Sequence, residues 1–126
     1  MDLTKYFDEH SGFGVLSTAD KDGRVNAALY ARPHCFEDGT VAFTMPDRLT
    51  HANLQSNHHA AYLFRQDAEA DDRRYVGLRL YLTKVGEDDD QDRIAALRRR
   101  TRGADREGRY LVIFRVEKQL PLLGAG

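Results

Sequence analysis

The residues with the clearest capacity for chemistry lie in segment 45–50, MPDRLT, where a strand-like pattern gives way to a helical one. The first N–H groups of a helix have no partner within the helix, and the positive end of its dipole attracts anions. Arg48 would add a planar set of donors suited to a phosphate, and Thr50 would add a hydroxyl. The segment therefore indicates a phosphate-binding loop, although an ordinary helix start with Thr50 as its N-cap explains the same residues equally well.

The strand pattern that precedes this loop contains small residues where bulky ones would be usual. Segment 26–32 reads NAALYAR and holds three alanines. Small side chains would let a flat ring approach the backbone closely. Alanines that lie beneath packed neighbours are the alternative, and the residues alone leave both open.

Two further patterns give no site of their own. Segment 12–17, GFGVLS, imitates part of a dinucleotide-binding fingerprint, but a helical pattern precedes it and a strand pattern follows, the reverse of what the motif requires. His51, His58 and His59 lie in a segment without Cys, Asp or Glu, so we expect no metal site. No residue stands out as a general acid or base, and the catalytic residues stay unknown.

The composition of the 126 residues fits one domain, residues 1–126. Nineteen Lys and Arg against twenty Asp and Glu give a formal charge of −1, so we expect no nucleic-acid partner. No apolar run approaches the roughly 18 to 20 residues of a membrane span, and segment 1–10 lacks a signal-peptide pattern. We therefore expect a cytoplasmic protein without a membrane partner. The single cysteine, Cys35, cannot form an internal disulfide, and its neighbour His34 would point to the opposite face of a strand.

The rest of the chain supplies the elements that would position these residues. Helical patterns cover segments 3–10, 50–57 and 87–100. Turn residues at 20–23 and 37–39 favour tight connections between the first three strands. The six strand patterns cover segments 14–18, 25–35, 40–45, 60–64, 75–85 and 110–116. This order predicts a mainly β fold, a closed or nearly closed six-stranded antiparallel β-barrel with small helices.

Four blocks of the sequence together resemble the pyridoxamine 5′-phosphate oxidase-related flavoproteins, the family of FMN-binding split barrels. The blocks are GVLSTADKDGRVNAALYARP (14–33), TVAFTMPDRLTHANLQSN (40–57), HAAYLF (59–64) and YVGLRLYLTKV (75–85). The resemblance covers most of the chain and rests on the order and spacing of the blocks. It implies a split β-barrel that holds FMN at the interface of a homodimer, with the flavin ring against the second and third strands and the phosphate at the loop that opens the next helix.

The same resemblance assigns residues to the cofactor. The second strand would line the ring or ribityl chain, the third strand would add contacts, and Arg48 and Thr50 would hold the phosphate. Asn53 would support the helix, and Arg79 on the fifth strand is a weaker candidate for a polar ring contact. The implied FMN-binding residues are Asn26, Ala27, Ala28, Tyr30, Phe43, Thr44, Met45, Arg48, Thr50, Asn53 and Arg79.

The sequence departs from the family pattern in two places. Many members carry a Lys or a second Arg in the phosphate loop, whereas Leu49 and Thr50 follow Arg48 here, so this loop holds less charge. True pyridoxamine phosphate oxidases grip their substrate through an Arg-containing stretch after a Trp, and this chain has no Trp. Oxidation of vitamin B6 is therefore not expected.

The function that these observations predict is that of an FMN-binding flavoprotein, an oxidoreductase acting on an unidentified small molecule. The flavin would supply the chemistry, and the protein would bind it, place its reactive edge and tune its potential. A non-catalytic flavin electron carrier is one alternative. A flavin-free protein of the same fold that binds haem or another planar ligand is the other, with His34, His51 or His58 as axial ligand.

Overall fold

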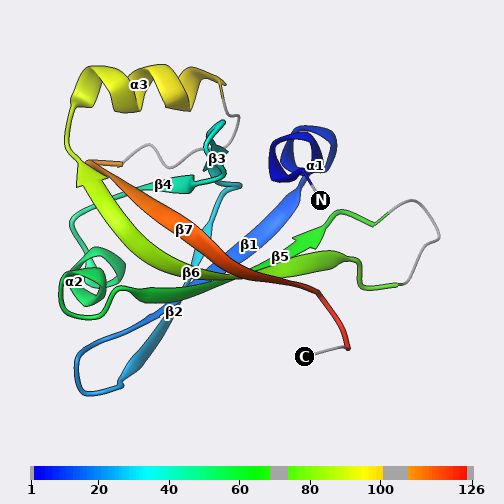
Figure 1. The fold of residues 1–126 in the computed structure, drawn as a ribbon, viewed down its shortest axis with the longest axis horizontal. Helices are drawn as coiled ribbons and strands as arrows, with labels where there is room; N and C mark the ends of the chain where they lie inside the picture. The colour runs from blue at the N-terminus through cyan, green and yellow to red at the C-terminus, as the bar shows by residue number, and fades with distance from the viewer. Residues whose placement is uncertain (1, 69–73, 101–107, 125–126) are drawn as a thin grey trace.

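The strand patterns of the sequence become one curled antiparallel sheet (Figure 1). The computed structural model describes residues 2–68, 74–100 and 108–124. Within them the helices are α1 (Leu3–Glu9), α2 (Leu49–Ser56) and α3 (Gln91–Arg100). The strands are β1 (Gly12–Ala19), β2 (Val25–Tyr30), β3 (His34–Cys35), β4 (Val41–Met45), β5 (His59–Gln66), β6 (Gly77–Asp88) and β7 (Tyr110–Pro121).

The sheet curls into a barrel because one segment supplies both of its edges. The strand order is β2-β1-β5-β6-β7-β4-β3, and every neighbouring pair is antiparallel. Segment 25–35 forms β2 at one edge and β3 at the other, so the chain passes directly from one edge to the opposite one. The mainly β, antiparallel split-barrel architecture predicted from the sequence is confirmed.

The predicted strand count is wrong by one, because the segment 25–35 is interrupted. β2 ends at Tyr30 and β3 begins at His34, which gives seven strands among the described residues. Pro33 has no N–H to donate to a strand ladder, so pairing stops before it. Arg32 fixes the bend, since its Nη1 donates to the carbonyl oxygens of Phe7 at 2.6 Å and His10 at 3.1 Å.

The predicted helix at 87–100 begins later than expected. β6 runs on through Glu87 and Asp88, which pair with Val112 and Leu111 of β7, and α3 starts at Gln91. Acidic residues favour a helix N-terminus, but here Glu87 and Asp88 belong to the long ladder between β6 and β7. Strand pairing therefore overrides the local helical preference.

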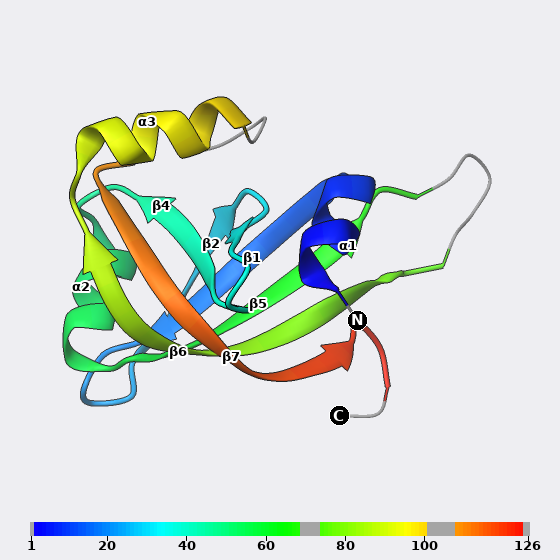
Figure 2. The same ribbon diagram turned by 45° about the horizontal axis from the view of Figure 1, so that its top comes forward.

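The helices cover different parts of the barrel (Figure 2). α1 inserts Phe7 into the main core, where its ring meets that of Phe64 edge-on at 5.1 Å. α3 buries Ile94 against Ala42 and Leu111, which form a second, smaller core. The main core is built from residues on nearly every strand, among them Leu16, Phe43, Tyr62, Phe64, Leu80, Leu82 and Phe114. No helix among the described residues is long and apolar enough to cross a membrane.

Gly14 on β1 is required by the packing of Tyr62. A Cβ at position 14 would lie 2.0 Å from Tyr62 Oη and 2.2 Å from Cζ. The fully buried Tyr62 reaches past this glycine from β5 and donates its hydroxyl to the carbonyl oxygens of Tyr30 and Ala31. The glycine pattern at 12–17 thus begins a strand, as the sequence predicts, and allows its close packing against Tyr62.

Candidate functional site

Segment 45–50 forms the junction between β4 and α2. Arg48 is the N-cap of α2, and the N–H of Ala52 donates to its carbonyl oxygen at 3.0 Å as the first bond of the helix. No side chain of the described residues caps this end. The N–H groups of the first three helical residues therefore lack an intrahelical partner, the arrangement that favours an anion.

Thr50 is not the N-cap, so the expectation of an ordinary helix start at this residue is wrong. It lies in the first turn of α2, 4% exposed, and its Oγ1 accepts a hydrogen bond from Asn26 Nδ2 at 3.3 Å. The hydroxyl therefore ties the helix to β2. Arg48 takes the cap position because its N–H donates to the Pro46 carbonyl oxygen at 2.9 Å, which turns the chain before the helix begins.

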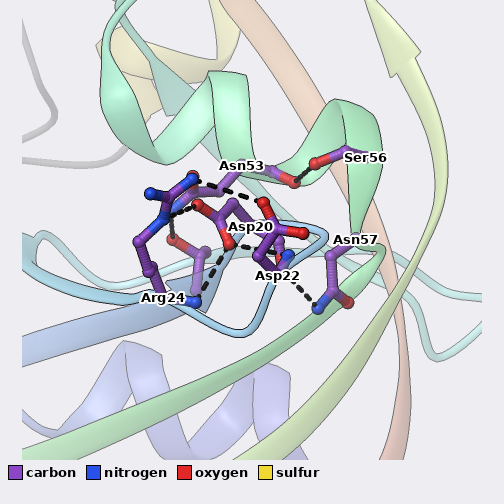
Figure 3. A network of polar contacts seen from close by, with 7 residues as sticks. Asp20, Asp22, Arg24, Asn53, Ser56 and Asn57 are labelled. Atoms are coloured by element: carbon purple, nitrogen blue, oxygen red, sulfur yellow. Dashed lines mark hydrogen bonds and ion pairs between the residues drawn. The ribbon is translucent and has the colours of Figure 1, made fainter.

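Asn53 holds α2 on the sheet. Its Nδ2 donates to Thr18 Oγ1 of β1 at 3.1 Å, and both residues are buried. At the other end of the helix, Asn57 Nδ2 donates to the carbonyl oxygen of Asp20 at 3.4 Å, and Asp20 in turn accepts hydrogen bonds from Arg24 within the β1–β2 turn (Figure 3). The helix and the β1–β2 hairpin are therefore linked at both ends of α2.

The predicted contacts on β2 divide between two faces. Asn26, Ala28 and Tyr30 are half-buried and share one face, where Tyr30 meets Phe43 edge-on at 6.0 Å. Ala27 points to the opposite, exposed face. A ring on the inner face of β2 could therefore use Ala28 and its two neighbours in the pleat, but not the side chain of Ala27.

The predicted contacts on β4 are covered by the chain itself. Phe43 and Met45 belong to the main core and are 2% and 0% exposed, and Thr44 is 5% exposed. Their side chains leave almost no surface for a ligand. What β4 retains is backbone, because β3 pairs with it only at Val41 and Ala42.

Arg79 lies apart from the other predicted residues. Its Nε donates to the Pro121 carbonyl oxygen and its Nη2 to that of Gly124, each at 3.0 Å. The guanidinium therefore holds the segment after β7. The structure does not bring Arg79 together with the 45–50 loop.

His51 forms a network that the sequence does not predict. Its ring stacks on Tyr110 of β7 at 3.8 Å, with 6° between the planes. Nε2 lies 3.0 Å from Glu87 Oε1, and Nδ1 lies 3.7 Å from Asp47 Oδ1. The spacing of Asp47, His51 and Gln55 along one helical face was a visible signal, whereas the partners on β6 and β7 were not.

Glu87 is the acceptor at the centre of this network. Burial alone would raise its pKa, but hydrogen bonds from Gln55, His51 and Lys84 outweigh burial and lower the pKa to about 2. The carboxylate is therefore ionised over the whole neutral range. Both ring nitrogens of His51 face carboxylates, which leaves neither directed at an axial position of haem. Among the described residues no three His, Cys, Asp or Glu gather as metal ligands.

No protein-family model and no curated protein matches this sequence. Solved structures do match. An FMN-binding protein from Syntrophomonas wolfei has a TM-score of 0.76 and 18% identity, over 95% of this chain and 83% of its own. HupZ from Group A Streptococcus has a TM-score of 0.71 and 19% identity, over 99% and 97%. A Clostridium acetobutylicum protein related to general stress protein 26 of B. subtilis, of the pyridoxinephosphate oxidase family, has a TM-score of 0.60 and 19% identity, over 96% and 89%.

This chain has the FMN-binding split-barrel fold. The resemblance read from the four sequence blocks is therefore confirmed for the fold. At these identities the comparisons bear on architecture, and the roles of individual residues rest on the geometry of this chain.

The split of the barrel lies beside the 45–50 loop. β2 and β4 are joined through β3, which pairs with β4 no further than Ala42, so among the described residues Phe43–Met45 has no strand partner on that side. The opposite side of β4 is fully paired with β7. The open backbone edge of β4, the inner face of β2 and the uncapped end of α2 therefore belong to one region of the split barrel.

Proposed function

We propose that this protein binds FMN at the junction of β2, β4 and α2 and acts as an oxidoreductase on a small molecule. The observation that carries the proposal is the N-terminus of α2, where the N-cap residue Arg48 is exposed and makes no capping hydrogen bond with its side chain. Thr50 and Asn26 link this end of the helix to β2. The names of two proteins with this fold, one FMN-binding and one of the pyridoxinephosphate oxidase family, support it.

The residues present fit a phosphorylated flavin. The first N–H groups of α2 and the guanidinium of Arg48 would hold the phosphate. Asn26 and Ala28 would flank the ring or ribityl chain on the inner face of β2, and the open edge of β4 would offer backbone groups. FMN would supply the transfer of a hydride or of single electrons.

The exposed face of the sheet supports a homodimer as part of this proposal. Val25 and Leu29 on β2 are 84% and 74% exposed, and Phe13 on β1 is 49% exposed. Leu29 pairs with Val15, and Val15 with Leu63 of β5, so apolar residues form a row across three strands. Exposed apolar patches of this kind are typical of protein–protein interfaces, and a second copy of this chain would cover this one. Sedimentation equilibrium should show a dimer, and a monomer at all concentrations would contradict this part.

The test of the cofactor proposal is the effect of Arg48→Ala on flavin affinity. A charge-assisted contact with phosphate contributes about 1.5 to 3 kcal/mol, so the Kd of FMN should rise by roughly ten- to a hundredfold. Riboflavin, which lacks the phosphate, should be unaffected. Flavin fluorescence measures both affinities, and Arg115→Ala on β7 is the control, because Arg115 is also exposed and pairs only with Glu117 among the described residues. Equal affinity of wild type and Arg48→Ala for FMN would contradict the proposal.

Turnover separates the enzyme from the electron carrier. An oxidoreductase should bleach its bound flavin with NAD(P)H or another small-molecule donor, whereas a carrier should bind FMN without such turnover. Of the three histidines named for the haem alternative, His51 has its ring nitrogens directed at Glu87 and Asp47, whereas His34 is buried and His58 is exposed.

A further inference from the structure

A cavity of about 640 Å³ lies between α1, the turn that joins β3 to β4, and β7. Small-molecule sites in proteins have volumes of about 300 to 1,000 Å³, so this α1–β7 cavity is large enough for one. It contains none of the residues assigned to the flavin. α1 and α2 lie on opposite sides of the barrel in both views, so the cavity is separate from the 45–50 loop (Figures 1 and 2).

One part of the cavity wall is apolar. Val41 is 1% exposed, and the half-buried Leu3 and Val116 pack beside it against the main core. Phe36 belongs to the wall as well, and it also lines a smaller cavity of about 130 Å³ under α1. The two cavities adjoin, because Thr4 and Cys35 line both of them together with Phe36. The hydrocarbon part of a ligand would therefore be removed from water here.

The charged side chains of the cavity wall are acidic. Asp2 and Glu37 line the α1–β7 cavity, and among the described residues no Lys or Arg lines either cavity. No described residue forms an ion pair with these two carboxylates. The guanidinium of Arg93 lies over the ring of Phe36 at 5.6 Å, but it is paired with Asp88 at 3.0 Å. The wall therefore favours a cation over an anion.

Cys35 provides independent support for a negative local field, because its thiol lies in the wall that the two cavities share. Burial, together with the negative charges of Asp8 and Asp2, raises the pKa of Cys35 to about 11. An environment that opposes a thiolate in this way favours a positive charge at the same place.

We propose that the α1–β7 cavity binds a small organic cation that has an apolar body and one protonated amine. The apolar body would lie against Phe36 and Val116, and the amine would lie beside Asp2 and Glu37. Apolar walls with a few well-placed polar groups are typical of small-molecule sites. The site goes beyond the proposed function, since it uses no residue of β2 or of the 45–50 loop.

The test compares 2-phenylethylamine with 2-phenylethanol, in which a neutral hydroxyl replaces the ammonium group. Titration is followed at low ionic strength in proton–nitrogen correlation spectra of the whole chain. The amine should shift the backbone signals of Phe36, Gly39 and Val116, which line the cavity. It should bind about threefold to tenfold more tightly than the alcohol, the range expected for two partly exposed charge pairs.

Three variants test the role of the carboxylates. Asp2→Asn keeps a residue that can cap α1, and Glu37→Gln keeps the length of the side chain. Each should weaken the amine by about twofold to fivefold and leave the alcohol unchanged, and the double variant should bind both probes about equally. Glu9→Gln is the control, because Glu9 is 56% exposed on α1 and does not line the cavity. The same spectra show whether each variant is folded.

The outcomes decide the inference without reference to FMN. Equal affinity of the wild type for the two probes would overturn the cation, and so would charge variants that behave like Glu9→Gln. Unchanged signals of Phe36, Gly39 and Val116 at the solubility limit of the amine would overturn the site itself. None of these results bears on the flavin proposal, which is tested by Arg48→Ala.

Discussion

Replacement of Gly14 by alanine should disrupt the contact that fixes the end of β2. The new Cβ would lie 2.0 Å from Tyr62 Oη, 2.2 Å from Cζ and 2.4 Å from Cε1. Carbon atoms pack at about 3.5 to 4.0 Å, so the ring would have to retreat by more than about 1 Å. Tyr62 is fully buried and cannot do this without displacing Phe43, whose ring lies 4.8 Å away.

The cost follows from the same contacts. Overpacking of a buried site costs about 1 to 3 kcal/mol, and the one hydroxyl hydrogen that Tyr62 shares between the carbonyl oxygens of Tyr30 and Ala31 contributes roughly 1 kcal/mol. Gly14→Ala should therefore lower the free energy of unfolding by about 3 kcal/mol, measured by urea denaturation. It should also weaken flavin binding, because the two carbonyl groups lie where β2 ends.

Substitution of a second glycine, Gly86, and of Tyr62 itself provides the controls for this prediction. A Cβ added at Gly86 on β6 would have no atom within 4 Å, so Gly86→Ala should change the free energy of unfolding by less than about 0.5 kcal/mol. Tyr62→Phe should not rescue Gly14→Ala, because the contacts to ring carbons remain. If Gly14→Ala is as stable as Gly86→Ala, the packing argument is wrong.

Two further predictions concern titratable groups. The pKa of Glu87 is about 2 in the fold, below its ordinary value of 4.5, so its contribution is complete above about pH 4.5 and is lost as the pH falls toward 2. Urea unfolding of Glu87→Gln between pH 3 and pH 7 should show lower stability at pH 7 and a shallower loss toward acid, and an unchanged pH profile would contradict the network. Burial, with the negative charges of Asp8 and Asp2, raises the pKa of Cys35 to about 11. Its reaction with a disulfide reagent should be slow at pH 8 and accelerate toward pH 10, whereas the rate of a free thiol at pH 8 would refute this.

Local patterns in the sequence predict most of the fold. Alternating apolar residues identify each strand region, and the turn residues at 20–23 join β1 and β2 as expected. The error at segment 25–35 arose because its residues suit a strand throughout, while Pro33 and the contacts of Arg32 with α1 bend the chain. Those contacts are made with residues more than twenty positions away, so no local pattern reports them.

The candidate site was predictable where it is local and not where it depends on strand register. The 45–50 loop and its link to a helix follow from neighbouring residues. The prediction of Thr50 as the N-cap was wrong, because its hydroxyl bonds to Asn26, 24 positions earlier. The partners of His51 were missed, because only the pairing of β7 with β4 and of β6 with β7 brings Tyr110 and Glu87 to this helix.

The way the sheet closes explains why its ligand and its partner would occupy neighbouring surfaces. Segment 25–35 supplies both edge strands, so β2 pairs only with β1 among the described residues and keeps one backbone edge open. Open edges and exposed apolar residues such as Leu29 favour association with other chains unless something covers them. A second copy on the outer face of β2 would cover those apolar residues, and a flavin would occupy its inner face. β2, the strand that carries Ala27 and Ala28, would therefore be stabilised by both contacts.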